Sequence, residues 1–336
     1  MRLWLSLYGS ILVVFGLTSL ALAGDFHTTT SLVCSDCHVM HYSETHTFTG
    51  AATPDPLLAP GGPFPRLLKN SQSQLCLACH DGKIDAPDVR GSNTGIFIRA
   101  AGQLTVSGDG NEGTGHTIGS AAAPPGGTWS NPGFQCIHCH DKHGNGYYRN
   151  LLPNPGTSTG KTVTYMTGSA YTGTAAIQQL AKTPLSTHYA ASNILYRQSQ
   201  ASSTNFGLSE WCGGCHGDFH GAGGASNIGG SPSGDTGISR WLRHPTRDVT
   251  MAEGVANRHV DTTHWFSSLL SRVPVVSPNG TIPGTASGSD NEVFCGSCHK
   301  AHGSQHLIGL IFDNETTVTA EDGTSLNQTC QQCHYQ

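Results

Sequence analysis

The chain has 336 residues, of which only 12% are charged and 36% hydrophobic, whereas typical globular chains contain roughly 25% and 45–50%. Its 43 glycines and 17 prolines stay below the level of low-complexity disorder, and the sequence has neither a collagen period nor a heptad repeat. The net charge of -5 supplies no basic surface, so nucleic acid is not an expected partner.

The chain begins with a segment typical of a secretory signal. Arg2 precedes an apolar run over 3–22, which closes on the small-x-small pattern Ala21-Leu22-Ala23. The alternative is an uncleaved anchor, because the run is nearly long enough to span a bilayer. We therefore expect a signal peptide over 1–23 and a single exported domain over 24–336, with no membrane association after cleavage.

All twelve cysteines fall into six Cys-x-x-Cys pairs, and a histidine follows each pair directly. We call these motifs I to VI in chain order. The cysteine pairs are Cys34/Cys37, Cys76/Cys79, Cys136/Cys139, Cys212/Cys215, Cys295/Cys298 and Cys330/Cys333, and the histidines are His38, His80, His140, His216, His299 and His334.

The Cys-x-x-Cys-His pattern is typical of covalent c-type haem attachment. The two thiols of a pair can add to the two vinyl groups of one porphyrin, and the next histidine then reaches the iron as proximal ligand. Zinc and a disulfide framework are the alternatives, because both use paired cysteines. Neither alternative uses the histidine that follows every pair, so the sequence predicts six covalently bound haem c groups.

Six porphyrins on this chain would supply the apolar core that the side chains lack. We expect a mostly irregular, coil multihaem cytochrome c, haem-cored, with a few short helices and short β-hairpins and no large sheet or bundle. Helices are predicted over 175–181 and 187–198, separated at Pro184. Strands or a hairpin are predicted over 161–166 and 309–320.

Thirteen further histidines are available for the second axial position of each iron. Methionine cannot fill many of these positions, because only three remain after the signal, so ligation by two histidines is expected throughout. The preferred distal candidates are His41, His116, His143, His220, His244, His259 and His302, with His27 in reserve. The remaining histidines are interpreted as surface residues: His46, His138, His188, His264 and His306.

Four of these candidates closely follow a proximal histidine. His41, His143 and His302 lie three residues after it, and His220 lies four residues after it. A residue so close to a proximal ligand cannot reach the far face of the same porphyrin, so each is expected to serve a neighbouring haem. The alternative is a surface histidine bonded to water or to a haem propionate.

At these residues the sequence resembles the extracellular hexahaem cytochromes that polymerise into conductive filaments on metal-reducing bacteria. The resemblance covers nearly the whole mature chain, although this chain is shorter between motifs IV and VI and continues motif II as Asp81-Gly82-Lys83. The matching strings, in order, are Phe26-His27, CSDCHVMH, Gly115-His116-Thr117-Ile118, Pro125-Gly126-Gly127-Thr128, QCIHCHDKHG, SEWCGGCHGDFH, Leu242-Arg243-His244-Pro245, CGSCHKAH and the final CxxCH.

The resemblance implies a chain of haems, all ligated by two histidines, in alternating parallel and T-shaped pairs. It implies that His41 crosses to the next subunit and ligates its fifth haem opposite His299. The function implied is long-range electron transfer outside the cell by a polymeric filament, with other redox proteins or extracellular acceptors as further partners. No catalytic residue is expected.

Two other functions remain open at this point. A multihaem reductase would need one iron with an open face, but all six motifs end in histidine and spare histidines are plentiful. A soluble periplasmic shuttle that does not polymerise would carry the same six motifs. The two differ from the filament in coordination and in assembly respectively.

Overall fold

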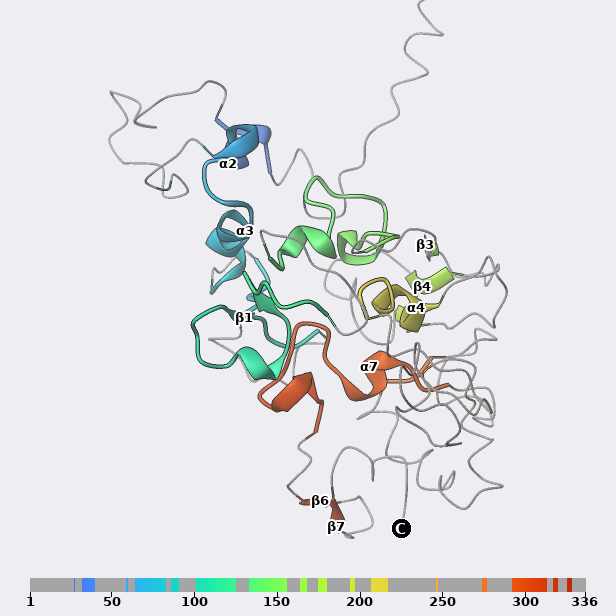
Figure 1. Ribbon diagram of the computed structural model, residues 1–336. Helices are drawn as coiled ribbons and strands as arrows, with labels where there is room; N and C mark the ends of the chain where they lie inside the picture. The colour runs from blue at the N-terminus through green and yellow to red at the C-terminus, as the bar shows by residue number, and fades with distance from the viewer. Residues whose placement is uncertain are drawn as a thin grey trace, which may run out of the picture.

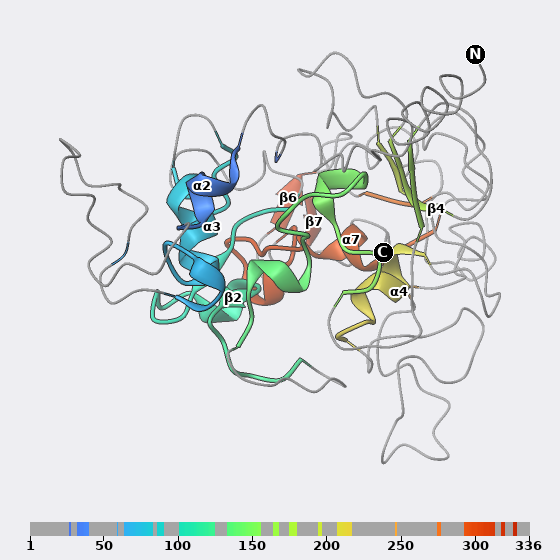
Figure 2. The same cartoon turned by 90° about the horizontal axis from the view of Figure 1, so that it is seen from above.

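The structure is a computed structural model, shown in Figures 1 and 2. It describes residues 27, 32–39, 59, 64–82, 86–90, 101–124, 133–155, 164–167, 175–179, 194–196, 207–216, 246, 274–276, 292–312, 317–319 and 325–327. The predicted signal peptide, motif VI and the turn-rich segment 221–237 lie outside these residues. Within the described part of the chain, no helix is both long and apolar enough to cross a lipid bilayer.

The regular elements are short and scattered along the chain. The helices are α2 (Cys34–Cys37), α3 (Gln72–His80), α4 (Leu208–Cys212) and α7 (Cys295–Cys298), and the 3-10 turns are η1 (Pro65–Leu67), η3 (Glu112–Thr114), η4 (Cys136–His138), η5 (Tyr148–Asn150) and η10 (Leu307–Gly309). The strands are β1 (Thr105–Val106), β2 (Thr117–Ile118), β3 (Thr164–Thr167), β4 (Ala175–Gln179), β5 (Ile194–Tyr196), β6 (Thr317–Thr319) and β7 (Ser325–Asn327).

The sheets are small. β1 and β2 pair in parallel, β3 pairs in parallel with β4, β4 pairs antiparallel with β5, and β6 pairs antiparallel with β7. In Figure 1 the elements α2, α3 and β1 lie on one side of the molecule, α4 and β4 lie on the other, and α7 lies between them. The predicted coil architecture, without a large sheet or bundle, is confirmed.

The two predicted helices over 175–181 and 187–198 are wrong. The structure has strands β4 and β5 in these segments, paired through Ile177 with Tyr196 and Gln179 with Ile194. Ala-Ala-Ile-Gln-Gln favours a helix by propensity, but only weakly, and burial of Ile177 and Ile194 in a common core outweighs it. The strand predicted over 161–166 is confirmed by β3, and that over 309–320 is confirmed by β6.

Two small apolar clusters hold the described segments together. The larger one joins η5, β4, β5, α4 and the segment before α7, and contains Tyr148, Ile177, Ile194, Leu208, Val276 and Phe294. The smaller one packs α3 against β1 and β2 through Leu77, Leu104 and Ile118.

Candidate haem-binding sites

The described motifs are helical around their cysteines: motif II lies within the longer helix α3, and the others form short helical turns. The backbone N–H of the proximal histidine donates to the carbonyl of the first cysteine in motifs I, III, IV and V, at 2.9–3.0 Å. This turn brings cysteines three residues apart to one side of the backbone. The ten described cysteines are free thiols, as thioether attachment requires.

Four proximal histidines face a second histidine from a distant part of the chain. The ring centroids are 6.4 Å apart for His38 and His143, and 6.1 Å apart for His80 and His27. They are 6.3 Å apart for His140 and His302, and 5.7 Å apart for His216 and His116. Every described motif except motif V therefore has an opposed imidazole pair.

The spacing of these pairs fits a single metal ion between the two rings. Two metal–imidazole bonds of about 2 Å, with about 1.2 Å from each nitrogen to its ring centre, give a centroid separation of about 6.4 Å. Three pairs match this value. The fourth is slightly compressed, with the Nε2 atoms of His116 and His216 3.4 Å apart.

Hydrogen bonds fix which ring nitrogen can bind the metal. Nδ1 of His38, His80 and His140 donates to the carbonyls of Arg66, Pro87 and Arg149, respectively, at 2.9–3.0 Å. His299 makes the same bond to Ile308, at 2.9 Å. Because Nδ1 carries the proton, Nε2 keeps its lone pair for the iron.

Burial keeps several of these rings neutral, which is the form that binds a metal. Removal from water lowers the pKa of His80, His140 and His299 below the ordinary histidine value. The pKa of His302 falls to about 3, first through burial and then through the nearby positive charge of His140.

Motifs I, III and V share a further local structure that we call the return turn. The segment after the motif comes back and pairs Leu68 with His38, Leu151 with His140, and Leu310 with His299. In each return turn, the carbonyl of the residue two positions before the leucine accepts the hydrogen bond from Nδ1 of the proximal histidine. The same residue has a left-handed backbone, with φ of 65° at Arg66, 50° at Arg149 and 53° at Ile308.

In motifs III and V, the histidine three residues after the proximal one lies opposite the proximal histidine of another motif. His143 of motif III faces His38 of motif I, and His302 of motif V faces His140 of motif III. Both partners lie two motifs earlier in the sequence, and the expectation that these histidines ligate a neighbouring haem stays a prediction. Among the described residues, no histidine ring faces His299.

In motifs II and IV, the proximal histidine lies opposite a histidine that comes from upstream of an odd-numbered motif. His27, which the sequence kept in reserve, precedes motif I and faces His80. His116 precedes motif III and faces His216. Nδ1–H of His27 donates to the carbonyl of Lys142, the residue before His143, at 3.3 Å. In the same way, Nδ1–H of His116 donates to the carbonyl of Ala301, the residue before His302.

Thiols of successive motifs meet in a regular alternation. The first cysteines of motifs II and III hydrogen bond, which raises the pKa of Cys76 and lowers that of Cys136 to about 7. The first cysteines of motifs IV and V do the same, which raises the pKa of Cys212 and lowers that of Cys295 to about 7. Between motifs I and II, and between III and IV, the second cysteines are the neighbours instead, Cys37 beside Cys79 and Cys139 beside Cys215.

Three glycines allow the backbone beside His116 to pack closely against the backbone beside His302. Gly303 bridges Gly102 and Gly115, and the N–H of His116 donates to the carbonyl of His302 at 3.0 Å. A Cβ on Gly115 would lie 2.3 Å from the Cα of Gly303, so only glycine permits this approach. The crossing sets the positions of His116 and His302 relative to each other.

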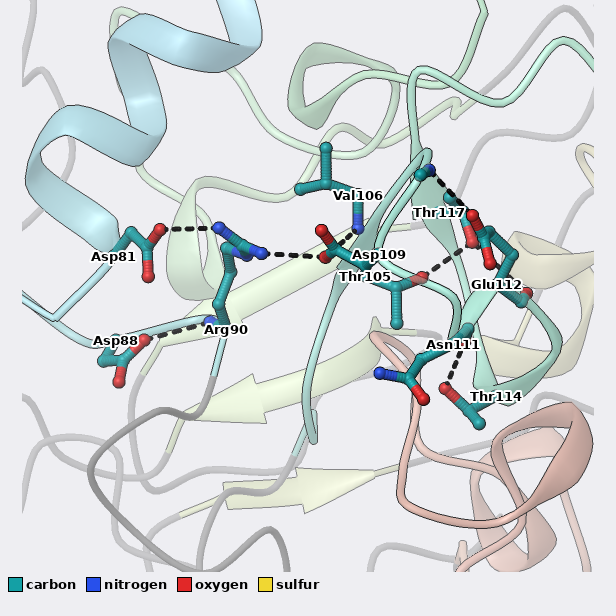
Figure 3. Close-up of polar contacts among 11 residues, drawn as sticks. Asp81, Asp88, Arg90, Thr105, Val106, Asp109, Asn111, Glu112, Thr114 and Thr117 are labelled. Carbon is teal, nitrogen blue, oxygen red and sulfur yellow. Dashed lines mark hydrogen bonds and ion pairs between the residues drawn. The ribbon is translucent and has the colours of Figure 1, made fainter.

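A polar clasp joins motif II to the loop after β1 (Figure 3). The guanidinium of Arg90 binds Asp81 at 2.9 Å and Asp109 at 2.7 Å, while Val106 N–H donates to the same Asp109 carboxylate. These carboxylates raise the pKa of Arg90 against the opposing effect of burial. The clasp ties the end of α3 to the segment that carries His116.

The other histidines of the sequence, both the remaining candidate ligands and those interpreted as surface residues, are placed as follows. His138 accepts the Gln135 N–H within its own loop, and His306 directly precedes η10. His41, His46, His188, His220, His244, His259, His264, Cys330, Cys333 and His334 lie outside the described residues.

No protein-family model matches the chain. The chain is 27% identical to the C-type cytochrome OmcS of Geobacter sulfurreducens over 389 aligned positions, covering 90% of this chain and 84% of that protein. Two solved filaments of the same organism are similar at 20% identity. The outer membrane cytochrome S filament has a TM-score of 0.46, covering 88% of this chain and 87% of the other, and the OmcS nanowire seen by cryo-EM has 0.43, covering 90% of each. The resemblance inferred from the ordered motifs is confirmed.

Proposed function

We propose that this chain is the subunit of an extracellular cytochrome filament, which carries electrons over long distances through six c-type haems. Each haem would be held by two thioethers, a proximal histidine and a distal histidine. When bound, the haem supplies one-electron redox chemistry, and the chain positions, ligates and encloses it. The observation that carries the proposal is the set of four opposed histidine pairs, which follow one another in chain order.

The pairs favour an electron carrier over a reductase. A reductase needs an iron with one open face, whereas each of these pairs places an imidazole on both sides of the metal position. Cysteines of successive motifs lie beside one another from motif I to motif V, so the haems attached to them would lie close enough for electrons to hop between neighbours.

The relation between odd motifs supports polymerisation. His143 of motif III lies opposite His38 of motif I, and His302 of motif V lies opposite His140 of motif III, so an odd motif would supply the ligand for the odd motif before it. Continued into the next subunit, the same relation would let His41 of motif I ligate the iron held by His299 of motif V. The relative OmcS, whose solved structures are filaments, supports the same assembly.

Electron microscopy of the purified native protein, combined with visible spectroscopy, tests this proposal. We expect filaments, a mass six haem units above that of the bare mature chain, and low-spin spectra that carbon monoxide does not change. A stoichiometric high-spin signal would favour a reductase. Monomers with all six irons low-spin would favour a periplasmic shuttle instead.

A further inference from the structure

The six motifs can be grouped into three modules of two, each beginning with an odd motif. Module A contains motifs I and II, module B contains motifs III and IV, and module C contains motifs V and VI. Each module opens with an odd motif, and all three odd motifs share the return turn. The module is defined by ligand exchange rather than by sequence length, because the motifs are unevenly spaced.

The two junctions between modules use the same pair of links. At the A–B junction, His143 faces His38, and Nδ1 of His27 donates to the carbonyl of Lys142. At the B–C junction, His302 faces His140, and Nδ1 of His116 donates to the carbonyl of Ala301. Both junctions therefore place one odd motif against the haem site of the preceding odd motif.

The B–C junction also shows which side chains meet there. Tyr148 in the return turn of module B is 7% exposed, and Phe294, just before motif V, is 4% exposed. Both belong to one buried cluster, linked through Tyr196, whose ring lies 6.5 Å from Tyr148 and 5.7 Å from Phe294. An apolar return turn thus packs with the residue that precedes the next odd motif.

The positions equivalent to Tyr148 and Phe294 in the first and last modules of the subunit are apolar and exposed. In the return turn of module C, Leu307 corresponds to Tyr148 and is 72% exposed, and its neighbour Ile308 is 65% exposed. Before motif I, Val33 corresponds to Phe294 and is 52% exposed. These are the three most exposed large hydrophobic residues in the described part of the chain.

We infer that the boundary between subunits reproduces the B–C junction, with Val33 of one copy packed against Leu307 and Ile308 of the next. The inference rests on the proposed function and adds the surface through which the copies meet. The occupant is a second copy of this chain, because the two exposed patches are the halves of a contact that the chain already makes internally. A contact between two different patches is heterologous and produces an open polymer.

Two full-length variants test the surface, Val33→Asp and Leu307→Asp. Each places a charge at one half of the contact, so each protein should carry six haems yet remain monomeric, with one iron per subunit no longer low-spin. Leu67→Asp is the matched control, because Leu67 is 39% exposed in the return turn of module A, inside the subunit rather than at its end. It should form filaments of normal length.

Mixing the two charged variants provides the decisive measurement. The Val33→Asp protein keeps an intact module C end and the Leu307→Asp protein keeps an intact module A end, so an equimolar mixture should give 1:1 dimers by mass photometry. The high-spin signal should fall by half, because one of the two open irons recovers its ligand. A like-to-like contact would instead give dimers of each variant before mixing, and mixing would change neither the dimer fraction nor the high-spin signal.

Milder variants guard against local misfolding. Val33→Ala and Leu307→Ala should raise the lowest protein concentration that supports filaments by about tenfold or more, because each removes buried apolar area. Normal filaments from both aspartate variants, or no dimer on mixing, overturn the inference while leaving the filament intact. A wild-type protein that is monomeric with six low-spin irons overturns the proposed function instead.

Discussion

The imidazole of His143 lies opposite that of His38, with the ring centroids 6.4 Å apart and the planes 29° from parallel. His143 belongs to motif III and His38 to motif I, so under the proposed function the ligands of one haem would come from two motifs that are not neighbours in the sequence. Ligation would therefore depend on tertiary structure as well as on the motif itself.

Replacement of His143 by alanine should open one iron per subunit while leaving all six haems attached. The thiols and proximal histidines are untouched, and only the ring opposite His38 is removed. The double variant His143→Ala/His302→Ala should open two irons, which quantitative paramagnetic resonance can count. His306→Ala is the control and should open none; a fully low-spin His143→Ala protein would refute the pairing.

His27→Ala should likewise open one iron, because His27 faces His80 at a centroid separation of 6.1 Å. His138→Ala is the matched control, since that ring accepts the Gln135 N–H inside its own loop. Carbon monoxide binding to the reduced protein distinguishes the two variants. Equal uptake by both would show that His27 is not a ligand.

His41→Ala tests the bond proposed between subunits. All six haems should remain attached, one iron should become high-spin, and filaments should shorten or vanish. Added imidazole should restore the low-spin spectrum but not the filaments, because the free ligand closes the iron without carrying a chain. Filaments of normal length from this variant would contradict the proposal.

Leu67→Gly should stabilise the protein. Leu67 has φ 60° in the return turn of module A, a conformation that costs a residue with a Cβ roughly 1–2 kcal/mol. The equivalent residue in module C is Gly309, with φ 69°. We expect the thermal midpoint to rise by a few degrees, and Asn150→Gly to give a smaller gain, because asparagine tolerates this region. A lower midpoint for Leu67→Gly would count against this interpretation.

Gly303→Ala should disturb two irons at once. Its added methyl would lie 2.7 Å from the carbonyl oxygen of Gln103 and 2.9 Å from the Cα of Gly115, so the backbones beside His302 and His116 must separate. High-spin signals from two haems per subunit are expected. Gly146→Ala, where nothing lies within 4 Å, is the control and should leave the spectrum unchanged.

The motifs predict the cofactor and the coil architecture because covalent attachment has a strict local pattern. The partners of the distal histidines could not be predicted, because pairs such as His140 and His302 form between segments far apart in the chain. His27 lacks the local context of His143, and only its place opposite His80 distinguishes it. The strands β4 and β5 were missed because pairing between them, rather than the residues of either segment, decides their conformation.

The return turns bind Nδ1 of the proximal histidine through a main-chain carbonyl rather than through a side chain. Every amino acid carries that acceptor, so the turns can differ as widely as Arg66, Arg149 and Ile308 without losing the bond. Mutations that alter the charge or size of these side chains would leave this hydrogen bond to the imidazole in place. The sequence of the return turns could therefore vary widely, while each proposed iron ligand keeps the same backbone acceptor.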